Sequence, residues 1–565
     1  MRHAGSFRVI ATSVRKIIVA SSLALAILAA IFLYQSGENR DLVAAATIQA
    51  GAIAASGKTS SSRAVVLTPA QMAAFGGTPS RPAVGTPNLP TIPLHEYNAA
   101  KTAAVAPGGQ RPLVPPGPPV FGGPALPIFS TNFPGAVEGE NGEPACCPPD
   151  VDSAVGISQI LQPTNSSIDV WKKTGVHQWS IGQNGFVGNF TDLIGDGRAV
   201  YDPIYSRWVV LIDDFSNFTN TGAVNYFLAI SQTSDATGAY FVFAPTVSLG
   251  GGSQFFDYPE LGIDQDAVLI TANMFNTAGT VFNGPVAFAI PKAKVYNGIG
   301  FSVPVFVLSA STTGSGTLAP PFVEDSNGLD FFVAAPVGSS QTALKKFTMS
   351  EAGRANVSFS GPVSIPLPSA ISYTTPPPNA PQPSPCTGSS AFLLDTLDGR
   401  FQNRSYQFGG VLWQTHAETN ITATPRFYQL NTTLNTTLQT GEYFKTGTSS
   451  DFNPHIAANT ANSAMVTWTS TDPPAGLNAA VMLGGRTSAT SVNTMPVDAT
   501  PVAGSTSCLA DNFDPAFGHQ RWGDYSAANL DPAQFGFFWV TNEKIAGSAS
   551  SGTDHWATHH AKATP

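Results

Sequence analysis

Short apolar runs alternate with polar turns from about residue 148 to residue 561. The stretch GDGRAVYDPIYSRWVV (195–210) shows the smallest unit of this pattern. A Gly-Asp-Gly turn precedes an apolar run ending at Tyr201, and an Asp202-Pro203 turn precedes a second apolar run that starts at Trp208. Because tight turns favour Gly, Asp and Pro, the pattern predicts two antiparallel strands joined by a tight turn.

Related pieces recur along the chain, and each is followed by further strand-like runs. They are PPDVDSAVG (148–156), GDGRAVYDP (195–203), FFDYPELGIDQDAVLITAN (255–273), VEDSNGLDFFVAA (323–335), LLDTLDGRF (393–401), FNPHIAAN (452–459) and RWGDYSAANLDP (521–532). Their starts lie about 45–70 residues apart, which leaves room for about four short strands per interval. The recurrence predicts an all-β fold, a six- or seven-bladed β-propeller in which small sheets surround one axis.

The N-terminal region has the pattern of an export signal. Basic residues precede an uncharged apolar run from Ile17 to Tyr34. This run, within residues 1–34, predicts an N-terminal hydrophobic helix, either an uncleaved signal anchor or a cleaved signal peptide. Both alternatives place the remainder in the cell envelope or outside the cell, and only the anchor attaches it to a membrane.

Residues 35–145 are rich in Ala, Pro, Gly, Ser and Thr and have little periodicity. Segments such as PLVPPGPPVF (112–121) exclude a helix, and proline lacks the donor that a central strand needs. We therefore expect a disordered linker over 35–145 and a folded domain over 146–565.

Composition narrows the choice of partners. Charged residues make up 11% of the chain, and the net charge of −9 excludes the basic face of a nucleic-acid-binding protein. The four cysteines include no C-x-x-C pair, which argues against a zinc site. In an exported chain a disulfide such as Cys386 with Cys508 is one alternative, and unpaired thiols are the other.

The repeated pieces resemble a group of largely uncharacterised secreted bacterial proteins with a sialidase-like β-propeller. The likeness rests on PPDVDSAVG, GDGRAVYDPIYSRWVV and DYPELGIDQDAVLITANMF, and the segments 394–416, 452–459, 521–532 and 537–543 extend it. It spans residues 148–560 and implies the fold and export, but no settled activity. His455 departs from the serine expected after Asn-Pro.

Polar residues at the repeat starts are the candidates for a site, because a propeller brings these positions to one end of its central channel. A sialidase-like site would use clustered arginines to hold a carboxylate, together with a tyrosine or a carboxylate that acts in catalysis. The catalytic candidates are Asp524, Tyr525 and Tyr258, and the ligand-binding candidates are Arg198, Asp257, Arg400, His416, Arg521 and Trp522. Structural roles are the alternative, because turn aspartates cap their own backbone and Arg and Trp pack between blades.

No resident cofactor is expected, apart from a structural calcium ion for which Asp150 and Asp152 are weak candidates. Neither G-x-S-x-G, a P-loop nor an opening G-x-G-x-x-G occurs in the predicted context. The leading hypothesis is an exported, non-catalytic binding or scaffold module that engages a glycan or an extracellular protein. The alternative is a sialidase-like glycoside hydrolase.

Overall fold

The computed structural model describes residues 51–75, 89–103, 127–139, 148–218, 225–249, 254–326, 328–498, 500–510, 513–514, 517–546 and 555–565. The chain forms two units, Met1–Ala52 and Ile53–Pro565, and the following account concerns the second. The predicted hydrophobic helix within 1–34 and the cysteines Cys146 and Cys147 lie outside the described residues. Within the described ranges, no helix is long and apolar enough to cross a membrane.

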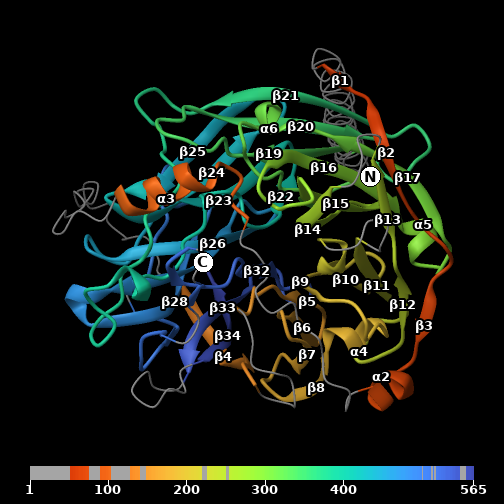
Figure 1. Ribbon diagram of the computed structural model, residues 1–565, viewed down its shortest axis with the longest axis horizontal. Coiled ribbons are helices and arrows are strands. Elements are labelled where there is room, and N and C mark those ends of the chain that lie inside the picture. The colour runs from red at the N-terminus through yellow and green to blue at the C-terminus, as the bar shows by residue number, and fades with distance from the viewer. Residues whose placement is uncertain are drawn as a thin grey trace, which may run out of the picture. The chain divides into compact units, whose positions relative to one another are not determined.

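The second unit is built mostly of small antiparallel sheets whose strands follow one another along the chain (Figure 1). In chain order these strands are β5 (Ala154–Val155), β6 (Gln159–Pro163), β7 (Ser167–Lys172) and β8 (His177–Gly182); β9 (Ile194–Asp202), β10 (Arg207–Asp214), β11 (Tyr226–Ser231) and β12 (Tyr240–Phe243); β14 (Phe255–Ile263), β15 (Ala267–Phe275), β16 (Phe282–Pro291) and β17 (Phe301–Val307); β19 (Leu329–Ala334), β20 (Ala343–Ser350) and β21 (Ser358–Pro366); β22 (Ser405–Phe408), β23 (Val411–Asn420), β24 (Thr422–Asn431) and β25 (Thr436–Glu442); β26 (Ser450–Ala458), β27 (Ala464–Asp472), β28 (Leu477–Arg486) and β29 (Ala503–Gly504); and β32 (Ala527–Leu530), β33 (Phe538–Ala546) and β34 (His555–Thr564). The all-β prediction is therefore confirmed.

Few other elements occur in the described ranges. The helices are α2 (Pro69–Phe75), α3 (Leu94–Ala103), α4 (Gln183–Val187), α5 (Lys292–Val295) and α6 (Ala310–Thr313), with 3-10 turns at Phe215–Phe218, Ser390–Phe392 and Pro473–Ala475. Short additional strands are β1 (Ala52–Ile53), β13 (Thr246–Leu249), β18 (Pro321–Val323), β30 (Phe513–Asp514) and β31 (His519–Gln520). β18 pairs in parallel with both β14 and β22 and so joins two of the small sheets.

The first strands of the sheets contact one another in a closed order. β5 contacts β9, β9 contacts β14, and β14 reaches β22 through β18. β22 contacts β26, β26 contacts β32, and β32 returns to β5. Each predicted opening piece contains or directly precedes the first strand of a sheet. Residues hundreds of positions apart in the sequence are therefore brought together at the middle of this ring.

The core lies between neighbouring sheets, because each sheet buries apolar side chains on both faces. Trp208 packs with residues of β6 and β7, while Trp413 and Trp468 share another apolar cluster that reaches β33. Of the five other tryptophans, Trp171, Trp522, Trp539 and Trp556 are at most 4% exposed, and Trp179 is partly buried. These aromatic side chains are packing residues, as the structural alternative proposed.

The prediction of a disordered linker over 35–145 and of a domain boundary at residue 146 is wrong, because strands from this region pair with strands of the folded domain. β3 (Val65–Leu67) pairs with β12, and β2 (Ala55–Ser61) lies between β17 and β13. β4 (Ile128–Val137) pairs along the length of β34. These N-terminal strands cover the outer edges of later sheets, where unpaired backbone groups need partners. The ring is therefore completed by residues that precede its first sheet.

Three of the first strands contain bulges at matching places. Asp196, Tyr258 and Asn453 have φ angles of 49°, 55° and 49°, and each is followed by Gly or Pro. The strand register shifts at each of these places. A bulge redirects the side chains that follow it, and strained non-glycine backbone persists only where its surroundings hold it. The bulges therefore set the direction of Arg198, Glu260 and His455, all of which are fully buried.

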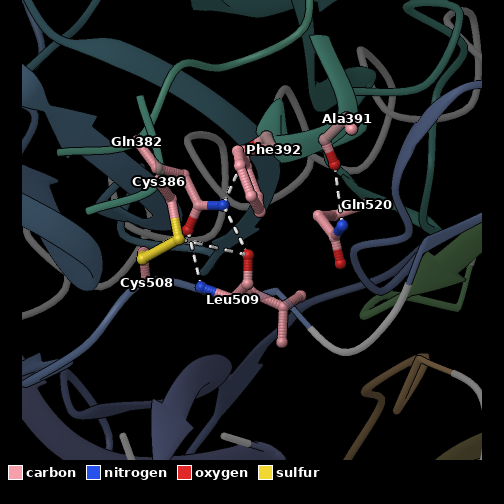
Figure 2. The surroundings of a disulfide bond; sticks show 7 residues. All are labelled: Gln382, Cys386, Ala391, Phe392, Cys508, Leu509 and Gln520. Atoms are coloured by element: carbon pink, nitrogen blue, oxygen red, sulfur yellow. Dashed lines mark hydrogen bonds between the residues drawn. A yellow bond between two sulfur atoms is a disulfide. The ribbon is translucent and has the colours of Figure 1, made fainter. Parts of the chain in front are cut away.

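A disulfide joins Cys386 and Cys508, the first of the two alternatives for these cysteines (Figure 2). It joins the proline-rich crossing before β22 to the segment before β32, across 122 positions of sequence. Beside it, the Gln382 amide donates to the carbonyls of Phe392 and Leu509 at 2.7 and 2.8 Å and accepts from the Leu509 N–H at 2.8 Å. The crossing is thus fixed by side-chain bonds, because its prolines supply few backbone donors.

Candidate functional site

The starts of the first strands carry a buried network of charged and aromatic side chains. We call this network, formed by Asp152, Arg198, Tyr258, Glu260, Arg400, Arg404, Asp524 and Tyr525, the central polar cluster. Each of these side chains is at most 5% exposed. Charges buried to this degree need direct partners.

Arg198 and Arg404 share the carboxylates of this cluster. The Arg198 Nη2 donates to Glu260 Oε2 at 2.9 Å and to Asn403 Oδ1 at 2.8 Å. Asp152 Oδ2 accepts from Arg404 Nη1 at 3.2 Å and lies 3.7 Å from Arg198 Nε. The network therefore joins β9 and β14 to the segments that precede β5 and β22.

Two tyrosines lie between the guanidinium groups. The Arg198 guanidinium lies 3.9 Å from the centre of the Tyr525 ring, and that of Arg400 lies 4.3 Å from the centre of the Tyr258 ring. The two rings are 4.8 Å apart. The Tyr525 hydroxyl donates to Asp196 Oδ2 at 3.0 Å. This stacking places two of the three predicted arginines in one continuous group.

Arg400 and Arg521 also form ion pairs with carboxylates of the protein. Arg400 forms a bidentate salt bridge with Asp398, to which its Nε and Nη2 each donate at 2.8 Å. Arg521 Nη2 donates to Asp524 Oδ1 at 3.3 Å, and the Tyr258 hydroxyl donates to the Asp524 carbonyl at 3.4 Å. The predicted residues Arg198, Arg400, Arg521, Tyr258, Tyr525 and Asp524 are thus brought together. Each arginine already binds a carboxylate of the protein, so the arrangement differs from an open clamp for a ligand carboxylate.

Burial raises the pKa of several carboxyl groups at this centre. It raises the pKa of Asp150, Asp196 and Asp257 to about 7, and neighbouring carboxylates act in the same direction. Burial also raises the pKa of Asp524 to about 8 and that of Glu260 to about 7, although Arg521 and Arg198 oppose the respective shifts. These groups change charge close to neutral pH, which is common at functional sites and in structural ion networks alike.

Two predicted ligand-binding residues lie elsewhere. His416 is fully buried, and its ring contacts the Gly399 carbonyl at 2.6 Å and the Tyr428 hydroxyl at 2.8 Å. Burial lowers the pKa of His416 to about 4, so the ring is neutral at pH 7. Trp522 is 1% exposed and packs against Phe452. Both side chains are core residues, because each is buried against aromatic neighbours, His416 against Tyr373 and Trp522 against Phe452.

His455, where the resemblance led us to expect serine, faces the central polar cluster. Its Nδ1 accepts from the Ala528 N–H at 2.9 Å, and the side chain is fully buried. Burial together with Arg404 and Arg198 lowers the pKa of His455 well below its usual range. The neutral ring fits between arginines where a protonated one would be repelled.

The segment 89–103, expected to be linker, packs onto the edge of the central polar cluster. The Thr91 N–H donates to Asp398 Oδ2 at 3.1 Å, and the Arg400 Nη2 donates to the Leu89 carbonyl at 2.9 Å. The Tyr97 hydroxyl donates to Asp395 at 2.9 Å, and Lys101 Nζ lies 3.2 Å from the same carboxylate. Burial opposes ionisation of Asp395, but Lys101 and His519 hold its pKa well below the usual range.

The weak metal candidates Asp150 and Asp152 are used differently from what the sequence suggested. Asp152 pairs with two arginines, while Asp150 accepts from the Asn165 amide at 2.5 Å and from the Asp524 N–H at 2.6 Å. Within the described ranges, the three acidic side chains that approach one another as metal ligands would are Asp196, Asp213 and Asp257, whose oxygens lie within 4.8 Å. Asp213 was not identified from the sequence, because it lies inside an apolar strand (β10).

A pocket of about 240 Å³ lies at the other ends of the same first strands. We call it the strand-end pocket. Its lining includes Val155, Tyr201, Asp202, Ile263, Asp264, Lys292, Phe322, Glu324, Tyr406, Asn459, Leu530, Asp531, Phe535 and Phe537. None of these is among the site residues predicted from the sequence, because the predicted residues lie at the starts of the repeats and the pocket lies at their ends.

The strand-end pocket combines aromatic rings with carboxylates. Phe535 is 72% exposed, although most of the large apolar side chains in the described chain are buried. Lys292 Nζ lies 2.6 Å from Asp202 Oδ2, so this charge pair is internal to the pocket wall. Glu324 Oε1 has no hydrogen-bond partner in the part of the chain that the structure describes. Burial and the neighbouring Asp325 raise the pKa of Glu324 to about 9.

No family model and no curated protein matches this chain. Among solved structures, an exo-β-1,3-galactanase from Phanerochaete chrysosporium is 12% identical, with a TM-score of 0.29 over 63% of this chain and 80% of that one. A subtype N10 neuraminidase-like protein of A/little yellow-shouldered bat/Guatemala is 9% identical, with a TM-score of 0.31 over 57% and 92%. An endo-arabinase from Bacteroides thetaiotaomicron is 12% identical, with a TM-score of 0.27 over 55% and 93%. At such scores the function has to be argued from the geometry of this chain.

Proposed function

We propose that this protein is an exported seven-bladed β-propeller that binds a glycan without transforming it. The blades would be the successive groups β5–β8, β9–β12, β14–β17, β19–β21, β22–β25, β26–β29 and β32–β34, with β4 completing the last. Export is supported by the basic and then apolar N-terminal sequence.

The strand-end pocket carries the binding proposal. Aromatic rings offer flat faces for the C–H surfaces of a sugar, and carboxylate and amide oxygens accept bonds from its hydroxyls. Phe535 and Phe537 supply rings beside Asp531, while Asn459 and Glu324, directly after β26 and β18, supply polar atoms. The volume of about 240 Å³ suits one sugar unit whose neighbours continue into solvent. The central polar cluster offers no comparable opening for a carboxylate ligand, because protein carboxylates already hold its arginines.

A glycan array with the full chain, followed by calorimetry on the best oligosaccharide, tests this function. Phe535→Ala should weaken binding by about tenfold, since a stacked aromatic contact contributes about 0.5–1.5 kcal/mol beyond its area. Leu434→Ala is the matched control, because Leu434 is 69% exposed and does not line the pocket. Equal losses in both variants, or no glycan bound at all, would refute the proposal and favour a protein partner.

A second candidate function, a glycoside hydrolase, is favoured by Glu324. A carboxyl group that stays protonated at neutral pH can act as a general acid, and a second carboxylate would serve as base or nucleophile. Burial acts against ionisation of Asp531, but the bond from Lys173 lowers its pKa below the usual range, so it stays charged. Turnover of a fluorogenic glycoside that Glu324→Gln abolishes, and the exposed control Leu434→Ala leaves intact, would establish this alternative in the strand-end pocket.

A further inference from the structure

The side chains of Asp196, Asp213 and Asp257 converge from two neighbouring sheets. Asp196 lies on β9, Asp213 on β10 and Asp257 on β14. One oxygen of each lies within 4.8 Å of the other two, and none of the three is more than 4% exposed. Three carboxylates this close repel one another strongly unless protons or a cation neutralise them.

Asp213 has a buried carboxylate oxygen that lacks a hydrogen-bond partner among the described residues. Its Oδ1 accepts the Asp214 N–H at 2.8 Å, whereas its Oδ2 is completely buried and has no partner among the described residues. Asn273 lies directly opposite Asp257 in the register of β14 and β15, so both side chains lie on the same face. The Asn273 Oδ1 is buried and has no partner in the described chain either. Two buried oxygens thus lack the donors that such atoms normally have.

The nearby arginines do not neutralise the three carboxylates, because each arginine is already paired with another carboxylate. Arg400 and Arg521 lower the pKa of Asp257, but Arg400 holds Asp398 and Arg521 holds Asp524. On the Asp196 side, the Tyr525 hydroxyl donates to Oδ2 at 3.0 Å. The neighbouring charges therefore leave a local excess of negative charge around Asp213.

We propose that Asp196, Asp213 and Asp257 bind one calcium ion that joins the second and third blades, with the Asn273 amide oxygen as a further ligand. All four donors are oxygens, which Ca²⁺ and Mg²⁺ prefer, whereas zinc sites use nitrogen and sulfur. Oxygens on opposite sides of Ca²⁺ are about 4.6–5.2 Å apart, compared with about 4.0–4.2 Å for Mg²⁺. Three oxygens that lie within 4.8 Å of one another can therefore surround a calcium ion. This site is independent of any glycan in the strand-end pocket.

Calcium titration of the EDTA-treated full chain tests this site directly. We expect about one Ca²⁺ per chain by calorimetry, a rise in Tm of about 2 °C or more with saturating calcium, and weaker binding of Mg²⁺. Asp213→Asn should lower calcium affinity by about tenfold or more, since it removes one charged ligand. Asp472→Asn is the control, because Asp472 is equally buried but accepts from Thr446 and Thr448 away from the site.

Each outcome decides the proposal. If wild-type protein binds no calcium and its Tm is the same in EDTA and in calcium, the three carboxylates are neutralised by protons and the site does not exist. Binding that survives unchanged in Asp213→Asn would place the ion elsewhere. If Asp213→Asn does not fold, the test rests on the wild-type titration and on Asp257→Asn. Calcium binding by the wild type that is weakened in Asp257→Asn would then support the site, and unchanged binding would refute it.

Discussion

The buried pair of Arg198 and Glu260 makes a sharp test of the central polar cluster. Arg198→Met keeps the length of the side chain but removes its charge, three hydrogen bonds and the stacking on Tyr525. Removing one partner of a buried pair typically costs about 3–5 kcal/mol, because the other charge remains buried without compensation. We therefore expect the free energy of unfolding to fall by about 3–5 kcal/mol.

The loss should depend on pH with a definite sign. Burial already raises the pKa of Glu260 to about 7 while Arg198 opposes the shift, so loss of Arg198 raises that pKa further. A carboxyl group whose pKa is raised in the folded state contributes stability below its unfolded pKa, and this contribution is lost as the pH rises through the folded value. The variant can protonate Glu260 at pH 5 at little cost, but not at pH 8. The difference between wild type and Arg198→Met should therefore grow from pH 5 to pH 8.

Urea unfolding followed by tryptophan fluorescence measures the change, and a double-mutant cycle assigns it. Arg198→Met combined with Glu260→Gln should cost less than the sum of the single changes, with a coupling of about 1–3 kcal/mol. Arg354→Met is the control, because Arg354 contacts Asp266 at 2.7 Å in an exposed pair whose loss should have little effect. If Arg198→Met is as mild as Arg354→Met, or the coupling is zero, the pair is solvated and the described network is wrong.

Three further predictions concern the rest of the ring. Replacing Cys386 and Cys508 by alanine together should lower the free energy of unfolding by about 2–5 kcal/mol, and non-reducing gels with urea unfolding will check this. A chain of residues 140–565 should aggregate where a chain of residues 51–565 is monomeric by size-exclusion chromatography, because only the shorter one leaves the edge of β34 without β4. Since burial raises the pKa of Glu324 to about 9, its contribution to stability is present below about pH 4.5 and is lost toward pH 9. Glu324→Gln should flatten the fall of Tm over this range, and an unchanged slope would contradict the burial of that carboxyl.

The sequence predicted the strands well because alternation and turns are local signals. The opening pieces fall at the first strands, and the disulfide joins the two cysteines that were one of the alternatives. The N-terminal strands were missed because β2 reads ASGKTSS, with no apolar alternation, and lies in a proline-rich region. Such edge strands are specified by the sheet they join rather than by their own residues. Composition alone therefore placed the domain boundary too late.

The sequence predicted which residues of the candidate site lie close together, but not how they pair. The proximity of Arg198, Arg400 and Arg521 to two tyrosines agrees with the repeat pattern, since the first strands of successive sheets contact one another. Their partners Asp398 and Glu260 could not be assigned, because pairing depends on bulges that redirect side chains. His416 proves to be a buried core residue, since a shift of one position along β23 turns a side chain to the opposite face. Trp522 precedes β32 and is buried against Phe452, a long-range contact that no local pattern indicates.

The residues at the starts of the first strands stabilise the fold, whereas those at the ends include exposed groups available to a ligand. At the starts, arginines are held by protein carboxylates within a nearly inaccessible network, so a substitution there disturbs several sheets at once. At the ends, Phe535 is exposed and Glu324 retains an oxygen without a partner among the described residues. Substitutions of Phe535 can therefore change the ligand at little cost to the ring. A variant series at Phe535 should alter glycan preference while Tm stays nearly constant, whereas parallel changes of Tm and affinity would show that the pocket is part of the structural core.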